Sequence, residues 1–430
     1  MKRLDYPNIA ERLYTAQLPN GLRIQVVPKP GFSSFYAVLA ANYGGAHRRF
    51  EIDGRHVDTP AGVAHFLEHK MFDLPGGDNA LNILSANGAD PNAFTSSGVT
   101  CYYFQCTDGF EENLRMLLHF VSTPYFTPET VQKEQGIIAQ EIRMGEDSPD
   151  SAVYYNLLEL LYAHHPIRDR VAGTVESIAQ ITDQTLYDCH RAFYAPSNMI
   201  LSVEGDVDPE RILAIAREEL PDELRPVPQA DLGPAEGPLP LEKRRAEAMA
   251  VSAPQFLIGA KLLPAPEGEA RLRQHLTAQL ALRMLAGASS PFYTRLYAQG
   301  LLNRDFDYEA DFSAGAGMVL LGGESPDPDK AAAAFAAEVE RVGREGFEPE
   351  RFQRAKRASL GARLRGLEDF ENVCLSLALG AFEGYCAFDA PALLSRIERE
   401  ECEAFVREAL APERLAVSII EPKQTGAETP

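Results

Sequence analysis

The sequence has few basic residues for its number of acidic ones. Its 430 residues include 41 lysines and arginines against 62 aspartates and glutamates, a formal net charge of −21 at pH 7. Proteins that bind nucleic acid need basic surface, so this balance argues against a nucleic-acid partner. Aromatic residues make up 9% of the chain and form no platform for stacked bases. We interpret the acidity as a means of staying in solution, with attraction of basic peptides as the alternative.

Long hydrophobic runs and paired cysteines are also missing. No stretch approaches the roughly 20 apolar residues that a membrane-spanning helix needs. The first residues, MKRLDYPNIAERLY, lack the apolar run of a signal peptide. The six cysteines are scattered and none stands in a Cys-x-x-Cys pair, so we expect reduced, buried thiols. Together these absences favour a cytoplasmic protein with no membrane partner.

The chain is too long for one ordinary core. The segment Pro221–Leu241, PDELRPVPQADLGPAEGPLPL, is rich in proline, glycine and acidic residues and has no apolar periodicity, so it predicts a linker. We therefore expect one domain over 1–220, a linker over 221–244 and a second domain over 245–430. The tail at 422–430 is expected to be disordered.

Strands and helices interleave irregularly in both halves. Runs of β-branched and aromatic residues predict strands at 22–28, 34–42, 99–105, 199–204, 256–261 and 317–322. Helices are predicted at 59–72, 111–122, 128–146, 151–163, 183–193, 270–286, 291–299, 330–345, 349–369 and 402–410. This mixture predicts an α+β fold with two parts of similar plan.

One short stretch, TPAGVAHFLEHKMF at 59–72, concentrates two of the nine histidines and a glutamate. Its opening threonine and proline are typical of a helix start. His65, Glu68 and His69 then project from one face of the helix. Two imidazoles one turn apart can hold a zinc ion, and the carboxylate between them can reach a water beside that ion. The alternative is a half-exposed helix with two unrelated histidines, a pattern expected by chance in about one such chain in a hundred.

A catalytic zinc ion needs a third protein ligand. The helix predicted at 128–146 carries Glu134 and Glu141, two turns apart on one face and next to isoleucines. An inward carboxylate among apolar residues needs a partner, which a metal ion or a metal-binding histidine can supply. Two glutamates alone more often mark a solvated face, so this assignment depends on the upstream histidines.

These motifs resemble those of the inverzincins, the insulinase/pitrilysin family of zinc metallopeptidases. The family pattern stands here as HFLEH at 65–69 and EQGIIAQE at 134–141. The resemblance covers most of the first half, including NGLRI at 20–24, GADPNAFTSSGVTCYYF at 88–104 and FYAPSNMILSVEGDVDPERI at 193–212. It is strongest for the smaller, two-domain bacterial members. It implies two similar domains, each a mainly antiparallel sheet with helices packed on it, joined by a linker as one half of a clamshell.

The resemblance also implies roles for individual residues. His65, His69 and Glu141 would bind one zinc ion per chain. Glu68 would be the general base for a zinc-activated water that attacks the peptide bond. Glu134 would orient one of the ligands.

A substrate-binding strand is implied as well. In the family the strand corresponding to NAFT, which comprises Asn92, Ala93, Phe94 and Thr95, pairs with the backbone of the substrate, and strand addition of this kind suits a loose sequence preference. The alternative is an ordinary turn that leads into a core strand.

The second half departs from the family pattern. Family members carry an arginine and a tyrosine, seven residues apart, that touch the substrate from the second domain, which has lost the zinc motif. The matching segment at 289–311 has Tyr297 where the arginine is expected, and Tyr308 would be the tyrosine, at a stretched spacing. Arg295 is a possible substitute. The alternative is a packing segment with no role in binding.

The resemblance thus implies a zinc metalloendopeptidase that cleaves peptides or short unfolded segments inside a closed chamber. Two-domain members pair, so we expect a homodimer, or a heterodimer with a related subunit that lacks the zinc motif. Two further functions stay open. One is a mainly structural subunit of a hetero-oligomer, and the other is a processing peptidase dedicated to one partner.

Overall fold

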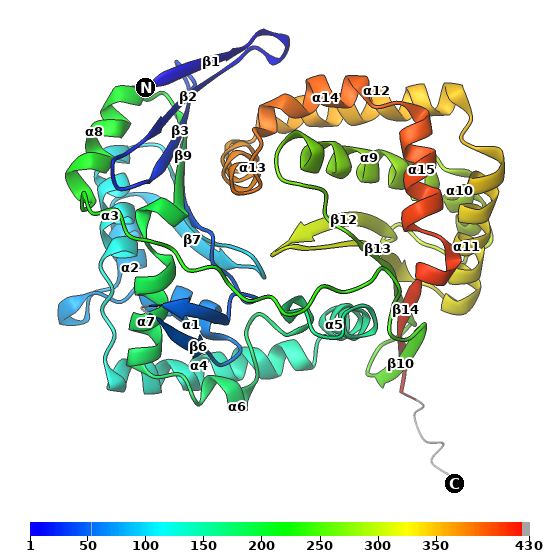
Figure 1. Ribbon diagram of the computed structural model, residues 1–430, viewed down its shortest axis with the longest axis horizontal. Coiled ribbons are helices and arrows are strands. Elements are labelled where there is room, and N and C mark those ends of the chain that lie inside the picture. The colour runs from blue at the N-terminus through cyan, green and yellow to red at the C-terminus, as the bar shows by residue number, and fades with distance from the viewer. Residues whose placement is uncertain (53, 424–430) are drawn as a thin grey trace. The chain divides into compact units, whose positions relative to one another are not determined.

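The computed structural model describes residues 1–52 and 54–423 (Figure 1). The tail at 422–430 is predicted to be disordered, and its residues 424–430 lie outside the described residues. The chain forms two compact units, each assembled from segments far apart in the sequence. Unit 1 comprises Met1–Ile142, Asp169–Leu232 and Ala362–Ala392, and unit 2 comprises Arg143–Arg168, Gly233–Gly361 and the described part of Leu393–Pro430.

A seven-stranded sheet lies at the centre of unit 1, in the order β1-β2-β3-β9-β4-β8-β7. Neighbouring strands are antiparallel except for β3 and β9, which are parallel. The strands are β1 (Lys2–Tyr6), β2 (Glu11–Gln17), β3 (Arg23–Pro28), β4 (Phe35–Ala41), β7 (Ala89–Thr95), β8 (Thr100–Cys106) and β9 (Met199–Gly205). A separate hairpin is formed by β5 (Arg49–Ile52) and β6 (Arg55–Asp58).

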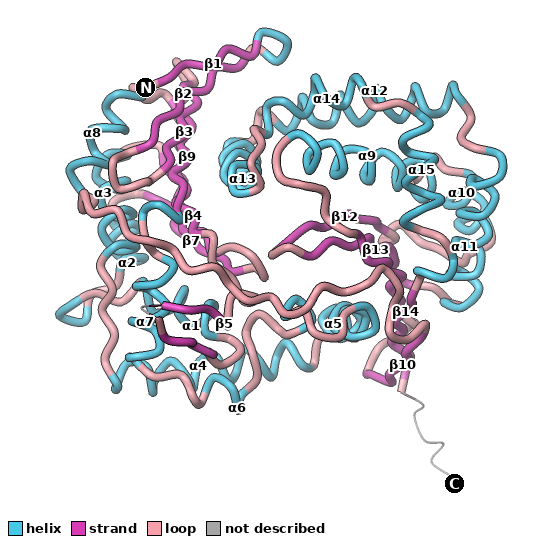
Figure 2. Tube along the Cα trace, viewed as in Figure 1, coloured by secondary structure: helices cyan, strands magenta, loops and turns pink. Residues whose placement is uncertain are grey.

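Both faces of this sheet are covered, as Figure 2 shows. Alternate residues of a strand point to opposite faces. In β4, Ala37 and Leu39 enter the large core formed with α1, α3, α7 and α8, whereas Tyr36 and Val38 pack against α13. The helices of unit 1 are α1 (Val63–Met71), α2 (Ala80–Ala86), α3 (Phe110–Ser122), α6 (Val175–Ile178), α7 (Asp183–Phe193), α8 (Pro209–Glu219) and α13 (Phe370–Phe382). The two-sided cover explains why β4 is apolar almost throughout.

Unit 2 is built around a five-stranded sheet in the order β10-β14-β11-β13-β12, again mainly antiparallel with one parallel pair, β10 and β14. Its strands are β10 (Arg244–Met249), β11 (Gln255–Leu262), β12 (Asp307–Ser313), β13 (Ala316–Glu324) and β14 (Ala416–Pro422). Its helices are α5 (Pro149–Leu161), α9 (Glu269–Ala286), α10 (Pro291–Ala298), α11 (Pro328–Glu345) and α15 (Arg399–Ala409). Three helices span segments of both units: α4 (Pro128–Glu146), α12 (Pro349–Gly366) and α14 (Ala390–Arg396). The predicted α+β class with mainly antiparallel sheets is confirmed.

The sheet of unit 2 receives a helix from the first half of the sequence. Leu157 and Leu161 of α5 share a buried cluster with Met318 and Leu320 of β13. The approach is close enough that a Cβ added to Gly259 of β11 would lie 2.8 Å from a methyl carbon of Leu157. A larger residue at this position of the strand would force the side chain of Leu157 to move.

The compact units do not coincide with the predicted boundaries at 1–220 and 245–430. Helix α5 comes from the first half of the sequence but belongs to unit 2, and α13 comes from the second half but belongs to unit 1. Each sheet has an apolar second face that must be covered. Sequence pattern shows that a helix has an apolar face but does not say which sheet that face will cover.

The predicted linker lacks helix and strand, as its composition suggested, but it is anchored. Apart from an isolated bridge at Ala230, residues 221–243 form no regular element. The carboxylate of Glu236 accepts hydrogen bonds from the backbone N–H groups of residues 163–165 at 2.8–2.9 Å and from Lys261 at 3.3 Å. Although burial acts to raise the pKa of Glu236, these donors lower it to about 2. The middle of the linker is therefore held in place within unit 2.

The helix of the histidine motif begins later than predicted. The hydroxyl of Thr59 does not cap it but donates to the carbonyl oxygen of Arg48 at 2.9 Å. Helix α1 instead starts at Val63 after Gly62, which has φ +94°. A Cβ at Gly62 would lie 2.6 Å from the carbonyl oxygen of Ala172. Only glycine fits this conformation and this approach, and the predicted start at Thr59 is therefore wrong.

Among the described residues, no single helix is long and apolar enough to cross a membrane; α13 and the segment Ala387–Arg396 pass that test only as a pair bent by 102°.

A buried glutamate, Glu204, lies in the part of the sheet on which α13 packs. Glu204 of β9 is fully buried, with Lys29 Nζ 3.2 Å from its Oε1, and Lys29 also pairs with Glu11 at 2.5 Å. Tyr36 lies opposite Glu204 on β4, and Cys374 of α13 is buried in the same layer. Burial raises the pKa of Glu204 from 4.5 to about 8, with Lys29 opposing.

The folded state thus keeps a proton on Glu204 that the unfolded chain loses above pH 4.5. Stability should therefore fall as pH rises from about 5 to 8, at about 1.4 kcal/mol per pH unit for this one group. Glu204→Gln removes this dependence. The check is urea unfolding of both proteins from pH 5 to 9, and pH profiles that run parallel would contradict the prediction.

Candidate metal centre

Helix α1 and the part of α4 that belongs to unit 1 bring together three side chains that could hold a metal ion. His65 and His69 lie one turn apart on α1, and Glu141 lies on α4. Nε2 of His65 is 3.4 Å from Oε1 of Glu141, and Nε2 of His69 is 3.7 Å from Oε2. One ligand atom from each residue lies within 4.8 Å of the other two. Of the part of the chain that the structure describes, no other group of three such residues meets this criterion.

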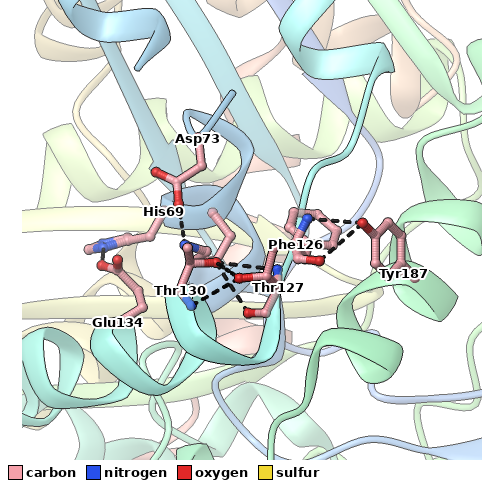
Figure 3. Close-up of polar contacts among 8 residues, drawn as sticks. His69, Asp73, Phe126, Thr127, Thr130, Glu134 and Tyr187 are labelled. Carbon is pink, nitrogen blue, oxygen red and sulfur yellow. Dashed lines mark hydrogen bonds and ion pairs between the residues drawn. The ribbon is translucent and has the colours of Figure 1, made fainter. Parts of the chain in front are cut away.

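Glu134 fixes the orientation of one imidazole. Its Oε1 lies 3.0 Å from Nδ1 of His69, and Figure 3 shows the two side chains facing each other. An ionised carboxylate can only accept, so Nδ1 carries the proton and Nε2 keeps a lone pair for a metal ion. The donor set of two imidazole nitrogens and one carboxylate fits zinc. Nδ1 of His65 is buried without a hydrogen-bond partner among the described residues.

The start of α4 is fixed by local hydrogen bonds, also drawn in Figure 3. Thr127 and Thr130 exchange hydrogen bonds in which each backbone N–H donates to the hydroxyl of the other residue, at 3.3 and 3.2 Å. The hydroxyl of Tyr187 on α7 accepts from the N–H of Phe126 at 3.0 Å and donates to its carbonyl oxygen at 3.1 Å. These contacts set the position from which Glu134 reaches His69.

The site concentrates negative charge around the two imidazoles. Burial acts to lower the pKa of His69, but its hydrogen bond with Glu134 and the charges of Glu68 and Glu141 raise it above its ordinary value. The imidazole of His65, helped by His69, lowers the pKa of Glu141 against the effect of burial. Three carboxylates around two imidazoles would favour a bound cation.

Glu68 lies on the same helix as the two histidines and is only 8% exposed. Its Oε2 accepts a hydrogen bond from the hydroxyl of Thr95 at 2.5 Å. Sequence reasoning assigned Thr95 to the substrate and missed this contact. The two residues are 27 positions apart in different elements, so no local pattern could have revealed the contact.

The NAFT segment is the end of an edge strand, as predicted. It forms the C-terminal end of β7. This strand pairs with β8 on one side and, among the described strands, has no neighbour on the other. Asn92 is exposed and Ala93 is half-buried. Contact of Asn92, Ala93, Phe94 and Thr95 with substrate stays a prediction.

Tyr297 and Tyr308 both belong to unit 2. Tyr297 is an exposed residue of α10 and stacks on Tyr293 with ring centroids 5.6 Å apart. Tyr308 lies on β12, the edge strand of the sheet, and a Cβ at Gly287 would lie 3.2 Å from its hydroxyl. Burial raises the pKa of Tyr308. Their contact with substrate, and that of Arg295, stays a prediction.

This chain matches two family profiles and several known proteins. Residues 54–175 match the sequence profile described as insulinase (peptidase family M16), and residues 180–359 match that of the peptidase M16 inactive domain. YmfH of Bacillus subtilis, named an uncharacterized zinc protease, is 37% identical over 98% of this chain and 100% of that protein.

Solved structures agree with this match. An M16-like peptidase from Alicyclobacillus acidocaldarius has a TM-score of 0.92 and 33% identity, covering 97% of this chain and 99% of that one. A protease from Helicobacter pylori has a TM-score of 0.82 at 17% identity, covering 96% and 100%, which bears on the fold alone. The chain therefore belongs to the insulinase family, peptidase family M16, and to its smaller bacterial type.

Proposed function

We propose that this protein is a zinc metalloendopeptidase that hydrolyses peptides or short unfolded segments. The observation that carries the proposal is the convergence of His65, His69 and Glu141, with Glu68 on the same helix face as the histidines. When bound there, zinc would supply a Lewis acid that makes water more acidic and polarises a carbonyl group. The name of the relative YmfH supports this reading.

The side chains of this protein would then divide the work. Glu68 takes a proton from the attacking water through its free Oε1 and passes it to the departing amine. Glu134 keeps the imidazole of His69 in the tautomer that presents Nε2. The free edge of β7 pairs with the substrate backbone, so the peptide is held by main-chain groups and the sequence preference is loose.

The complete ligand set favours an enzyme over a structural subunit. A subunit with a mainly structural role has no need to keep two imidazoles and three carboxylates around one point, because like charges brought together cost free energy. Two units with one such centre suit a protein that acts as a dimer, with itself or with a related subunit that lacks the zinc motif. Size measurement of the purified protein and of the native extract tells these two dimers apart.

Metal analysis with a cleavage assay tests the proposal. Purified protein should contain about one zinc ion per chain. Removal of zinc by a chelator should abolish cleavage of a quenched fluorescent peptide, and returning zinc should restore it. A protein that takes up no zinc and cleaves no peptide would overturn the proposed function.

A further inference from the structure

The carboxylate of the base candidate Glu68 has a single hydrogen-bond partner among the described residues. That partner is Thr95, whose hydroxyl donates to Oε2 of the carboxylate at 2.5 Å. Hydrogen bonds from a hydroxyl to a carboxylate are short and strong because one group is charged. Since Glu68 is 8% exposed, water has little access to replace this donor.

The hydroxyl of Thr95 is itself held by the β7–β8 hairpin. Thr95 is the last residue of β7 and lies opposite Thr100, the first residue of β8. Ser96 and Val99 close the turn between them, with the N–H of Ser96 donating to the carbonyl oxygen of Val99 at 2.8 Å. The hydroxyl of Thr100 donates to the carbonyl oxygen of Tyr43 at 2.8 Å. The hydroxyl of Thr95 also lies 3.3 Å from that of Thr100, but its hydrogen goes to the carboxylate of Glu68, which is the nearer acceptor and is charged.

We propose that Thr95 is a positioning residue for the base rather than a contact for the substrate, an inference that rests on the proposed peptidase function. By holding Oε2, Thr95 leaves Oε1 of Glu68 to face the water. Thr95 is also the last residue of the edge strand on which a peptide would pair. Its hydrogen bond therefore fixes the position of the carboxylate relative to the scissile bond. A misplacement of about 1 Å can cost about 10²-fold in rate.

Two substitutions separate the hydroxyl from the shape of the side chain. Thr95→Val keeps the shape and removes the donor, so kcat should fall about 10–100-fold while KM and the zinc content stay close to wild type. Thr95→Ser keeps the donor and should recover most of the rate. If the valine variant folds poorly, Thr95→Ala tests the same loss without an added methyl group.

Thr15→Val is the matched control. Thr15 is a half-buried residue of β2 in the same sheet, outside the site, and the same chemical change there should leave kcat and KM at wild-type values. A Thr95→Val enzyme that is as fast as this control would overturn the inference.

Peptide binding supplies a readout that does not depend on turnover. In the non-cleaving Glu68→Gln background, adding Thr95→Val should leave the Kd of a fluorescent peptide unchanged, because a positioning residue acts through the carboxylate. A clear rise in Kd would make Thr95 a substrate contact and overturn the inference. A wild-type protein that binds zinc but cleaves nothing would instead count against the proposed function.

Discussion

Glu68→Gln is expected to reduce kcat for peptide cleavage by about 10³-fold, within the 10²–10⁴-fold that a positioned base contributes. The amide has nearly the same shape as the carboxylate, and its oxygen can still accept the hydrogen bond from Thr95. It cannot take a proton from water. The change therefore removes proton transfer and leaves the packing of α1 as it is. Steady-state kinetics on a quenched fluorescent peptide measures the loss.

Two controls accompany this measurement. The variant should still contain about one zinc ion per chain, because the ligands are untouched. Glu146→Gln makes the same chemical change at an exposed position of α4 and should leave kcat unchanged. Cleavage by Glu68→Gln at the wild-type rate would mean that another group is the base.

His65→Ala is expected to abolish tight zinc binding. It removes one of the three proposed ligands and leaves a pair, His69 and Glu141, that would hold the ion far more weakly. Glu134→Gln should have a smaller effect, because Glu134 contacts the imidazole of His69 and not the metal position. Loss of such an outer partner costs about 10–100-fold in affinity. Competition for zinc against a coloured chelator ranks the proteins.

The test is the order of zinc affinities among these proteins. Wild type should bind zinc most tightly, Glu134→Gln next and His65→Ala least, with Glu146→Gln indistinguishable from wild type. If Glu134→Gln lost more affinity than His65→Ala, the roles of ligand and outer partner would have to be exchanged. If His65→Ala kept wild-type affinity, the metal would lie elsewhere.

Much of the site could be predicted because its parts are local. His65, Glu68 and His69 share a face through the 3.6-residue period of one helix, and Glu134 and Glu141 do so through that of another. The same local signals predicted α4 and α7 with the bounds that the structure has. The start of α1 was mispredicted because a favourable Thr-Pro pair was outweighed by Gly62, whose close approach to Ala172 is a tertiary contact.

Helix α13 is an element that the sequence pattern did not predict. Its sequence, FENVCLSLALGAF, is apolar over most of its surface, so it lacks the polar face that marks an amphipathic helix. It nevertheless packs on β4 and β9 at the centre of the sheet in unit 1. The same layer contains Glu204, whose burial only the packing of α13 on β4 and β9 could establish.

By itself, the sequence determined the family, through the resemblance of its motifs. It also determined the α+β class and the residue types of the candidate metal site on two helices, because these depend on composition and on short periodic spacing. Only the tertiary structure decided that α1 and α4 meet so that His65 and Glu141 face each other, that Thr95 holds Glu68, and that α5 and α13 pack outside their own sequence halves. Each of these depends on which faces pack together across long separations in the chain. That choice is made by the fit and burial of whole surfaces, which no local window of sequence contains.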